Sequence, residues 1–334
     1  MPRKCRQISL TAILLLLMSP TALAHERAER TELAVPAIGR NFPDPDVLTH
    51  DGQHYAYATN TAGYNVQLAT ATDAKASWEQ RPDALPRLPP WVGPAETGSL
   101  NVWAPDVSER SDGSFLLYYT AHHTASGRQC IGAAVADSPE GPFSPTSSDP
   151  LICAPGQGDV IDPASFVDSD GSRYLLYKDS RGSRARSGPS TIHLRPVAAD
   201  GLTQAGEDIP LLSADRPEES GVVEAPTLLR RPGGYVLLYS GNTFDSGRYF
   251  TNYATSSSPT GPFTKAPGAL LSSAVLGGAV SNPGGQDVFA DDELIAFHAD
   301  LPEPVGDRGL WIGELEWDGL NPVLSPGSAV RARH

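Results

Sequence analysis

Acidic and amide side chains recur at nearly even spacing along this chain of 334 residues. Each stands at the start of a short segment that runs through a turn into an aromatic, strand-like stretch. The turn residues extend from Asp51 to Asp291, which is 240 residues in four steps and a mean period of 60. If the segments occupy equivalent places in a repeat, their polar side chains converge on one pocket. The five polar residues are Asp44, Asp106, Asp162, Glu224 and Gln286.

Several carboxyl groups in one pocket are suited to the cleavage of a glycosidic bond. One carboxyl group must be protonated so that it assists the leaving group, and a second must be ionised. In the inverting reaction the ionised group activates a water molecule, and the two groups lie roughly 6.5–9.5 Å apart. Their mutual repulsion raises the pKa of the group that is better shielded from solvent, so that one fold holds both protonation states. The structural alternative is that these acids cap turns or form salt bridges around a channel.

The repeat also predicts the elements that position these residues. A period near 60 residues with strand-like content is typical of a β-propeller, in which each repeat forms one blade. We therefore expect an all-β protein with five four-stranded antiparallel blades around a central channel. Two matching segments, Ala136–Phe143 and Ser256–Phe263, predict the turn between the third and the outer strand of two blades. The aromatic strands are expected at Tyr55–Tyr57, Phe115–Tyr119, Tyr174–Tyr177, Tyr235–Tyr239 and Leu294–Phe297.

Residues 1–24 do not belong to this fold. A basic start at Arg3, Lys4 and Arg6 precedes an apolar run, and Ala22–Ala24 forms a small-residue cleavage signal. This pattern predicts a secretory signal peptide and hence a secreted, extracellular protein. We expect residues 25–38 to form a flexible lead-in and residues 39–334 to form a single propeller domain.

Charge and cysteine content restrict the partners. Removal of the signal peptide takes the formal net charge from −14 to −17, which argues against nucleic acid and membrane as partners. We expect a monomer that binds a polysaccharide or oligosaccharide. Cys5 leaves with the signal peptide, so Cys130 and Cys153 remain, and in an oxidising compartment we expect them to form a disulfide. Two separate buried thiols are the alternative, and metal binding by this pair is not expected without clustered histidines.

Several of these segments resemble the motifs of glycoside hydrolase family 43. The resemblance extends over nearly all of the chain beyond the signal peptide. It implies a secreted five-bladed propeller that cleaves arabinose- or xylose-containing polysaccharides with inversion. The matching segments are Pro43–Val47, Trp103–Asp106, Ile161–Pro163, Val223–Pro226 and Leu315–Gly319 with Pro322 and Val323.

The resemblance implies a role for each of three carboxyl groups. Asp44 would be the general base that deprotonates the attacking water, and Glu224 would be the general acid that protonates the departing sugar oxygen. Asp162 would be the third carboxyl group, which holds the acid in place and tunes its pKa. Asp46 is the main rival for the base, because strand alternation puts it on the same side as Asp44.

Six further residues are candidates for substrate binding. The tryptophans could stack on a sugar face, although aromatic residues in propellers also pack between blades. The arginines could hold a substrate hydroxyl or carboxylate group, and the family often uses an arginine from a late blade. The six residues are Trp91, Trp103, Asp106, Arg248, Gln286 and Arg308.

One segment departs from the family pattern. Many members carry a histidine in the fifth-blade motif, near a metal ion on the channel axis, whereas Asn282–Asp287 has glycine at that place. Gln286 could point into the channel instead. We therefore expect no required cofactor, and a calcium or sodium ion held through waters is the alternative.

The activity expected from the resemblance is that of an α-L-arabinofuranosidase. Endo-1,5-α-L-arabinanase and β-xylosidase activities are alternatives, the xylosidase ranking lower because such members usually carry a second β-sandwich domain. A carbohydrate-binding propeller without activity is a further alternative. The carboxyl trio argues against it, because desolvating an ionised and a protonated acid together brings no benefit to binding alone.

Overall fold

The computed structural model describes residues 35–95, 98–153, 158–179 and 188–325. The predicted signal peptide, with Cys5, and residues 25–34 of the predicted lead-in lie outside these ranges. No helix within these ranges is long and apolar enough to cross a membrane.

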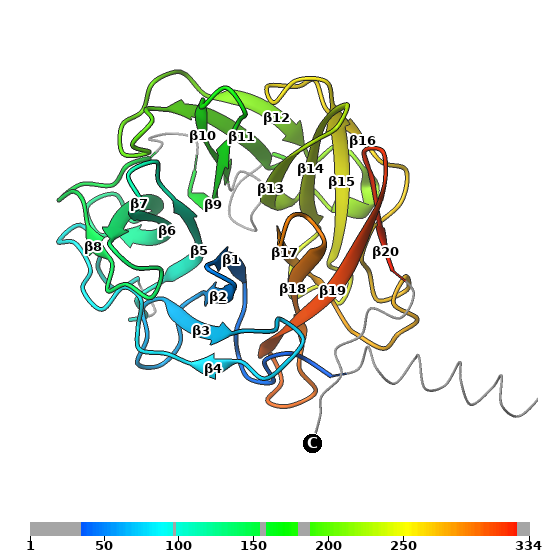
Figure 1. The fold of residues 1–334 in the computed structure, drawn as a ribbon, viewed down its shortest axis with the longest axis horizontal. Helices are drawn as coiled ribbons and strands as arrows, with labels where there is room; N and C mark the ends of the chain where they lie inside the picture. Colours follow the sequence, from blue (N-terminus) through cyan, green and yellow to red (C-terminus); the bar gives the residue numbers. More distant parts are fainter. Residues whose placement is uncertain (1–34, 96–97, 154–157, 180–187, 326–334) are drawn as a thin grey trace, which may run out of the picture.

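The described residues form five four-stranded antiparallel sheets, each built from consecutive strands. The prediction of a five-bladed β-propeller is thus confirmed, and Figure 1 shows the innermost strand of each sheet facing the centre of the ring. The single helical element among these residues is a 3₁₀ turn at Pro217–Glu219. The blades are β1 (Asp46–His50), β2 (Gln53–Ala58), β3 (Gln67–Ala71) and β4 (Glu79–Gln80); β5 (Val102–Glu109), β6 (Phe115–His123), β7 (Arg128–Ala136) and β8 (Ser144–Pro145); β9 (Val160–Val167), β10 (Arg173–Asp179), β11 (Thr191–Val197) and β12 (Ile209–Ser213); β13 (Val223–Arg231), β14 (Gly234–Gly241), β15 (Phe250–Ser256) and β16 (Thr264–Lys265); and β17 (Gly284–Phe289), β18 (Leu294–Asp300), β19 (Arg308–Asp318) and β20 (Asn321–Leu324).

The local patterns that suggested the fold have the expected positions. All five predicted aromatic stretches lie in the second strand of a blade. The two matching Pro-Gly segments connect β7 to β8 and β15 to β16, between the third and outer strands. In the first hairpin, Asp51 and Gly52 both have positive φ (49° and 74°), the conformation that a two-residue turn between twisted strands requires.

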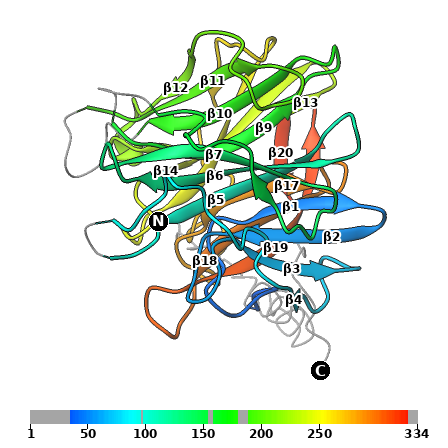
Figure 2. The same cartoon turned by 90° about the vertical axis from the view of Figure 1, so that its left-hand side faces the viewer.

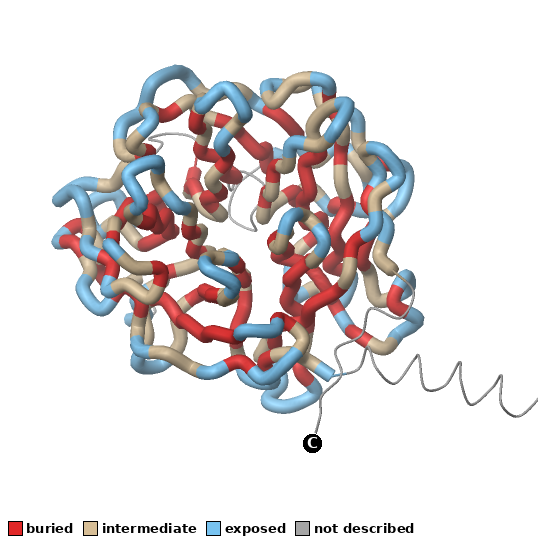
Figure 3. Tube along the Cα trace, viewed as in Figure 1, coloured by how far each residue is buried: buried red, intermediate tan, exposed pale blue. Residues whose placement is uncertain are grey.

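Hydrophobic packing lies between the blades. The buried side chains form five clusters, and each cluster joins one pair of neighbouring blades. Figure 3 shows that the strands are largely buried, whereas the loops around the rim are exposed. Because each blade is packed on both faces, the inner strands are held in fixed positions around the axis.

The ring closes through contacts between the first and last blades. Ile38 and Leu310 exchange two backbone hydrogen bonds, of 3.2 and 3.0 Å, and Ile38 is 3% exposed. Figure 2 shows the first blade beside strands β18 and β19 of the last blade. The last residue of the predicted lead-in is therefore part of the ring closure.

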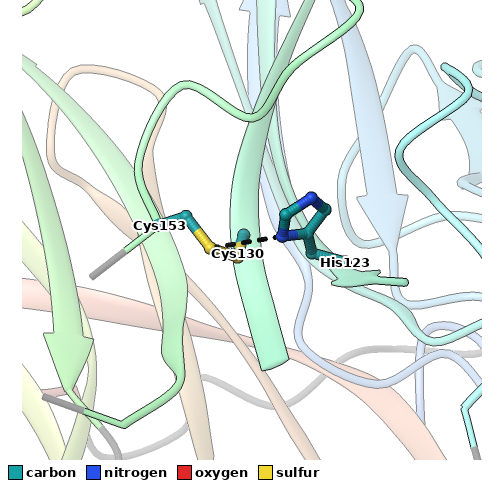
Figure 4. Close-up of side chains that lie close together, drawn as sticks. All are labelled: His123, Cys130 and Cys153. Atoms are coloured by element: carbon teal, nitrogen blue, oxygen red, sulfur yellow. Dashed lines mark hydrogen bonds between the residues drawn. A yellow bond between two sulfur atoms is a disulfide. The ribbon is translucent and has the colours of Figure 1, made fainter. Parts of the chain in front are cut away.

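The predicted disulfide is present. Cys130 on β7 and Cys153 are bonded, with Cα atoms 4.7 Å apart. Figure 4 shows His123 beside the bond, with its Nδ1 atom 3.7 Å from Cys153 Sγ. The fold thus places a histidine beside the two cysteines, although no cluster of histidines was expected there. Both sulfur atoms are used by the disulfide.

Candidate active site

A cavity of about 600 Å³ lies at the centre of the ring, and all five inner strands line it. Asp44, Asp162 and Glu224, the three predicted catalytic residues, are all part of its lining. The chain thus brings together carboxyl groups from blades one, three and four.

The same backbone irregularity shapes each inner strand. At or just before the start of the inner strand, each blade has one residue with a positive φ between 43° and 57°, which is uncommon for residues other than glycine. In blades two to five the pairing with the second strand shifts at this place, as at a β-bulge, which re-aims side chains. The residues with positive φ are Asp44, Ala104, Asp162, Ala225 and Gly285.

The five polar residues predicted from the repeat do not occupy equivalent positions relative to this positive-φ residue. Asp44 and Asp162 stand at the position with positive φ, whereas Glu224 is one residue before it. Gln286 is one residue after it and Asp106 two residues after it. The residues were therefore equivalent as segments but not position by position. The proline that follows the position in four blades (Pro45, Pro105, Pro163 and Pro226) is the signal that could have fixed the register.

Neighbouring inner strands are joined at this position by side chains of the second strands. In four blades a hydroxyl or imidazole group accepts a hydrogen bond from the backbone N–H of the positive-φ residue in the next blade. These bonds hold the cavity wall to a defined shape. The pairs are Thr59 with Ala104 (2.9 Å), Thr120 with Asp162 (3.2 Å), Ser240 with Gly285 (2.9 Å) and His298 with Asp44 (3.0 Å).

Blade three departs from this pattern. Its equivalent residue is Lys178, whose ammonium group lies 2.5 Å from Glu224 Oε2. The backbone N–H of Ala225 is bound instead by Asp162 Oδ2 at 3.0 Å. Sequence reasoning missed Lys178, because within Tyr174–Asp179 it reads as an ordinary residue of a strand.

Asp44 is surrounded by hydrogen-bond donors. Arg308 Nη1 lies 3.0 Å from Asp44 Oδ1, and Thr59 donates to Oδ2 at 2.6 Å. Burial by itself would raise the pKa of Asp44, but Arg308, His298 and Thr59 together lower it well below its usual range. Burial and the adjacent Arg308 lower the pKa of His298, so that this imidazole stays neutral at neutral pH. Asp44 is consequently ionised and fixed in orientation.

Glu224 and Asp162 form a second charged group. Lys178 contacts one oxygen of Glu224, and the Tyr249 hydroxyl donates to the other at 2.8 Å. Burial and the neighbouring Glu224 carboxylate raise the pKa of Asp162 to about 7. Two carboxyl groups with opposite protonation tendencies, Asp44 and Asp162, therefore face the same cavity.

A further set of aspartates lies two residues beyond the positive-φ position. Asp46 accepts a hydrogen bond from Val107 N and Asp287 from Val47 N, each at 2.9 Å, so both join neighbouring blades. Desolvation, together with the charges of Asp287 and Asp106, raises the pKa of Asp46 well above its usual range. A base must be ionised, so this environment favours Asp44 over its rival Asp46.

Four of the six predicted substrate-binding residues line the cavity: Trp103, Asp106, Gln286 and Arg308. The structure does not bring the other two there. Trp91 is 6% exposed and stacks on Tyr119 in the core between the first two blades, with ring centroids 6.2 Å apart. Arg248 lines a separate depression of about 360 Å³ beside β15. Phe244, Thr243 and Tyr249 line the cavity and were not predicted.

The residues near the fifth-blade motif do not fit an axial metal ion well. Gln286 Oε1 accepts hydrogen bonds from Ser240 and Thr251, each at 2.9 Å, and Nε2 donates to the carbonyl oxygen of Ala225 at 2.6 Å. His298 Nε2 lies 3.3 Å from the guanidinium group of Arg308, whose charge would repel a cation. These ligand atoms are committed to the protein, and we assign no chemical step to a metal.

Comparisons with known proteins agree with the motifs and the fold. The model of the glycosyl hydrolases family 43 matches residues 34–320. A β-D-galactofuranosidase, xynD, of Aspergillus niger is 26% identical over 281 residues, which cover 78% of this chain and 75% of that protein. Extracellular endo-α-(1→5)-L-arabinanase 2 of Bacillus subtilis is 27% identical over 312 residues, covering 85% of this chain and 60% of that protein. The crystal structure of a thermostable family-43 glycoside hydrolase superposes with a TM-score of 0.75 at 26% identity, covering 88% of this chain and 97% of that chain.

Proposed function

The chain belongs to the glycosyl hydrolases family 43, and on that premise we propose that it is an exported, inverting α-L-arabinofuranosidase of plant cell-wall polysaccharides. The observation that carries this proposal is the single cavity lined by Asp44, Asp162 and Glu224. Each of the three carboxyl groups has a distinct set of partners, as an acid, a base and a tuning group require.

We assign the general base to Asp44. Its low pKa keeps it ionised across the range in which such an enzyme works, and three protein groups fix its orientation. A carboxylate in this state accepts a proton from a water molecule as that water attacks the anomeric carbon. Asp46 is less suited to the role, since its raised pKa favours the protonated form.

We assign the general acid to Glu224 and the tuning role to Asp162. Glu224 enters the cavity from β13, and its two oxygen atoms are oriented by Lys178 and Tyr249. The acid must give a proton to the glycosidic oxygen as the bond breaks. Asp162 is coupled to Glu224 by charge, since the Glu224 carboxylate contributes to the raised pKa of Asp162, and it fixes the backbone beside Glu224 through the N–H of Ala225.

The sugar is held by the remaining lining residues in this proposal. Trp103 is half-buried and lines the cavity, so its ring can stack on a sugar face. Phe244 is 47% exposed and packs against Arg308, whose guanidinium carbon lies 4.5 Å from the ring centroid. These residues offer one apolar surface and one cationic donor to the substrate.

Two of the relatives support a substrate with a five-membered sugar ring or an arabinan chain. The Aspergillus relative is named for a galactofuranoside, and the Bacillus relative for the 1,5-linked arabinan backbone. The Bacillus name makes endo-arabinanase activity the second candidate, because that relative matches 85% of this chain. Export is supported by the predicted signal peptide, by the disulfide and by the extracellular description of the same relative.

The test is hydrolysis of a panel of substrates by the purified protein. We expect turnover of 4-nitrophenyl α-L-arabinofuranoside and release of arabinose from linear arabinan. The matching β-D-xylopyranoside and β-D-galactofuranoside should react much more slowly. Proton NMR of the first product should show the inverted anomer. Oligosaccharides as the main product from linear arabinan would support the endo-acting alternative, and activity confined to the xyloside or the galactofuranoside would contradict the proposal.

A further inference from the structure

Lys178 is a buried ammonium group in the wall of the cavity. The residue is 6% exposed, and among the described residues that line the cavity only Lys178 and Arg308 carry a positive charge. Burying an ammonium group is costly unless it is paired. Its partner is Glu224, at 2.5 Å.

Lys178 pairs with Glu224 of the next blade, but it does not bind the backbone of that blade as the equivalent residues of the other blades do. The equivalent residues Thr59, Thr120, Ser240 and His298 each offer an acceptor to the next blade. An ammonium group can only donate hydrogen bonds, so Lys178 cannot do this. Asp162 satisfies the N–H of Ala225 in its place. The lysine is therefore free to act on Glu224.

Both oxygen atoms of Glu224 accept a hydrogen bond. Lys178 donates to Oε2, and the Tyr249 hydroxyl donates to Oε1. An ionised carboxylate accepts at both oxygens, whereas a carboxylic acid uses one of them as a donor. Glu224 thus has the contacts of an ionised group, although a general acid must carry a proton.

The Tyr249 hydroxyl could instead accept a hydrogen bond from a protonated Glu224, but that proton would then point at the tyrosine and not at the substrate. The oxygen that protonates the substrate must therefore lose its present donor before Glu224 can act as an acid. Tyr249 is firmly held, because it is 3% exposed, stacks on His298 with centroids 5.7 Å apart, and donates its backbone N–H to Asn282. The lysine side chain has a flexible four-carbon stem. Lys178 is accordingly the partner that can move.

We propose that Lys178 is a positioning residue that keeps Glu224 ionised and oriented in the free enzyme, and that a sugar bound in the cavity separates the two side chains. Glu224 Oε2 then takes up one proton from solvent, and Lys178 keeps all three of its own N–H bonds. This inference rests on the proposed role of Glu224 as the general acid. It adds that Glu224 becomes protonated only when substrate is bound.

Other titratable groups face this pair. Asp162 on β9, Asp179 on β10 and Tyr249 interact electrostatically with Lys178 or Glu224, as does His298 on β18, and Asp44 acts on Asp162. Burial alone would lower the pKa of Lys178, but the carboxylates of Glu224 and Asp162 raise it overall. The lysine therefore stays positively charged, and separation from it makes protonation of Glu224 easier.

The test compares the pH dependence of kcat/KM with that of kcat on an arabino-oligosaccharide, whose poor leaving group requires the acid. The first quantity reports on the free enzyme and the second on the complex with substrate. The wild-type alkaline limb of kcat should lie at least about one pH unit above that of kcat/KM, a tenfold change in proton affinity. Coincident limbs in the wild-type enzyme would overturn the proposal, and this result needs no variant.

Lys178→Met should raise the alkaline limb of kcat/KM to that of kcat and so close the gap. No movement of the kcat/KM limb would overturn the proposal, as would an equal movement of both limbs. The matched control is Lys265→Met, which removes another lysine with a buried side chain, 2.7 Å from Glu219 and outside the cavity lining. That variant should keep the gap. If Glu224→Gln retained full activity on the oligosaccharide, the proposed function itself would fail, which is a separate result.

Discussion

Replacing Arg308 with methionine should move the acidic limb of activity to higher pH. Arg308 Nη1 lies 3.0 Å from Asp44 Oδ1, with the two side chains 14% and 26% exposed. Methionine keeps much of the apolar stem and removes the charge. Because a general base must be ionised, activity falls as the pH drops through the pKa of Asp44. Loss of a neighbouring cation raises this pKa, so the limb moves up.

The size of the shift follows from the geometry. Two unit charges about 4 Å apart attract by about 4 kcal/mol at an effective dielectric constant of about 20. His298 offsets part of the loss, since Arg308 contributes with burial to the lowered pKa of this imidazole, and removal of Arg308 raises the pKa of His298 beside Asp44. We therefore expect a shift of about 1 to 2 pH units, or about 1.4 to 2.7 kcal/mol.

The assay is kcat/KM for 4-nitrophenyl α-L-arabinofuranoside from about pH 1.5 to about pH 6, with folding checked at each pH by circular dichroism, because the lowered pKa of Asp44 puts its acidic limb well below pH 4. Loss of a substrate contact would lower the whole profile, whereas loss of the Arg308 charge beside Asp44 would move its acidic limb. The matched control is Arg231→Met, because Arg231 pairs with Asp292 at 2.7 Å and stacks on Trp317 at 4.3 Å, outside the cavity lining. A folded Arg308→Met variant whose acidic limb stays in place would refute the assignment of Asp44 as a base tuned by Arg308.

Three further predictions test the surroundings of the site. Burial raises the pKa of Asp287 to about 7. The folded protein therefore binds this proton more tightly than the unfolded chain, and its stability falls as the pH rises from about 4 to about 7. Asp287→Asn should raise the unfolding free energy, measured by urea titration, by about 1 to 2 kcal/mol at pH 8 and by nearly nothing at pH 4. An equal gain at both pH values would contradict the raised pKa. Tyr249→Phe removes the donor 2.8 Å from Glu224 Oε1 and should lower kcat on arabino-oligosaccharides by about tenfold with little change in melting temperature. Unchanged kcat would show that this hydrogen bond does not orient the acid in the complex with substrate. Replacing both Cys130 and Cys153 with alanine opens a link across 23 residues and should lower the unfolding free energy by about 3 kcal/mol while kcat stays the same; a fall in kcat without a loss of stability would assign the disulfide a role at the site.

The sequence predicted the parts of the structure that depend on periodic patterns. The spacing of turns and aromatic strands gave the number of blades, because each blade repeats the same hydrophobic and turn chemistry. The Asp-Pro and Glu-Ala-Pro segments identified the inner strands, since the chain bends at this point in every blade.

Features that depend on contacts between blades were not visible in the sequence. The proposed role of Lys178 depends on its contact with Glu224, which is 46 residues away in the chain. Trp91 and Arg248 were reasonable sugar-binding candidates by residue type, but packing buries the first between blades and places the second beside another depression. His298 lies in an ordinary aromatic strand, and only ring closure brings it to Asp44.

The assignment of Glu224 as the general acid and Asp44 as the general base is tested most directly by varying the leaving group of the substrate. Glu224→Gln should lose about a thousandfold or more of kcat/KM on an arabino-oligosaccharide. The same variant should stay within about tenfold of wild type on the 2,4-dinitrophenyl arabinofuranoside, whose leaving group needs little protonation. Asp44→Asn should lose activity on both substrates to a similar extent, because both reactions need the activated water. If Glu224→Gln impaired the two substrates equally, or Asp44→Asn spared either of them, the assigned roles would be wrong.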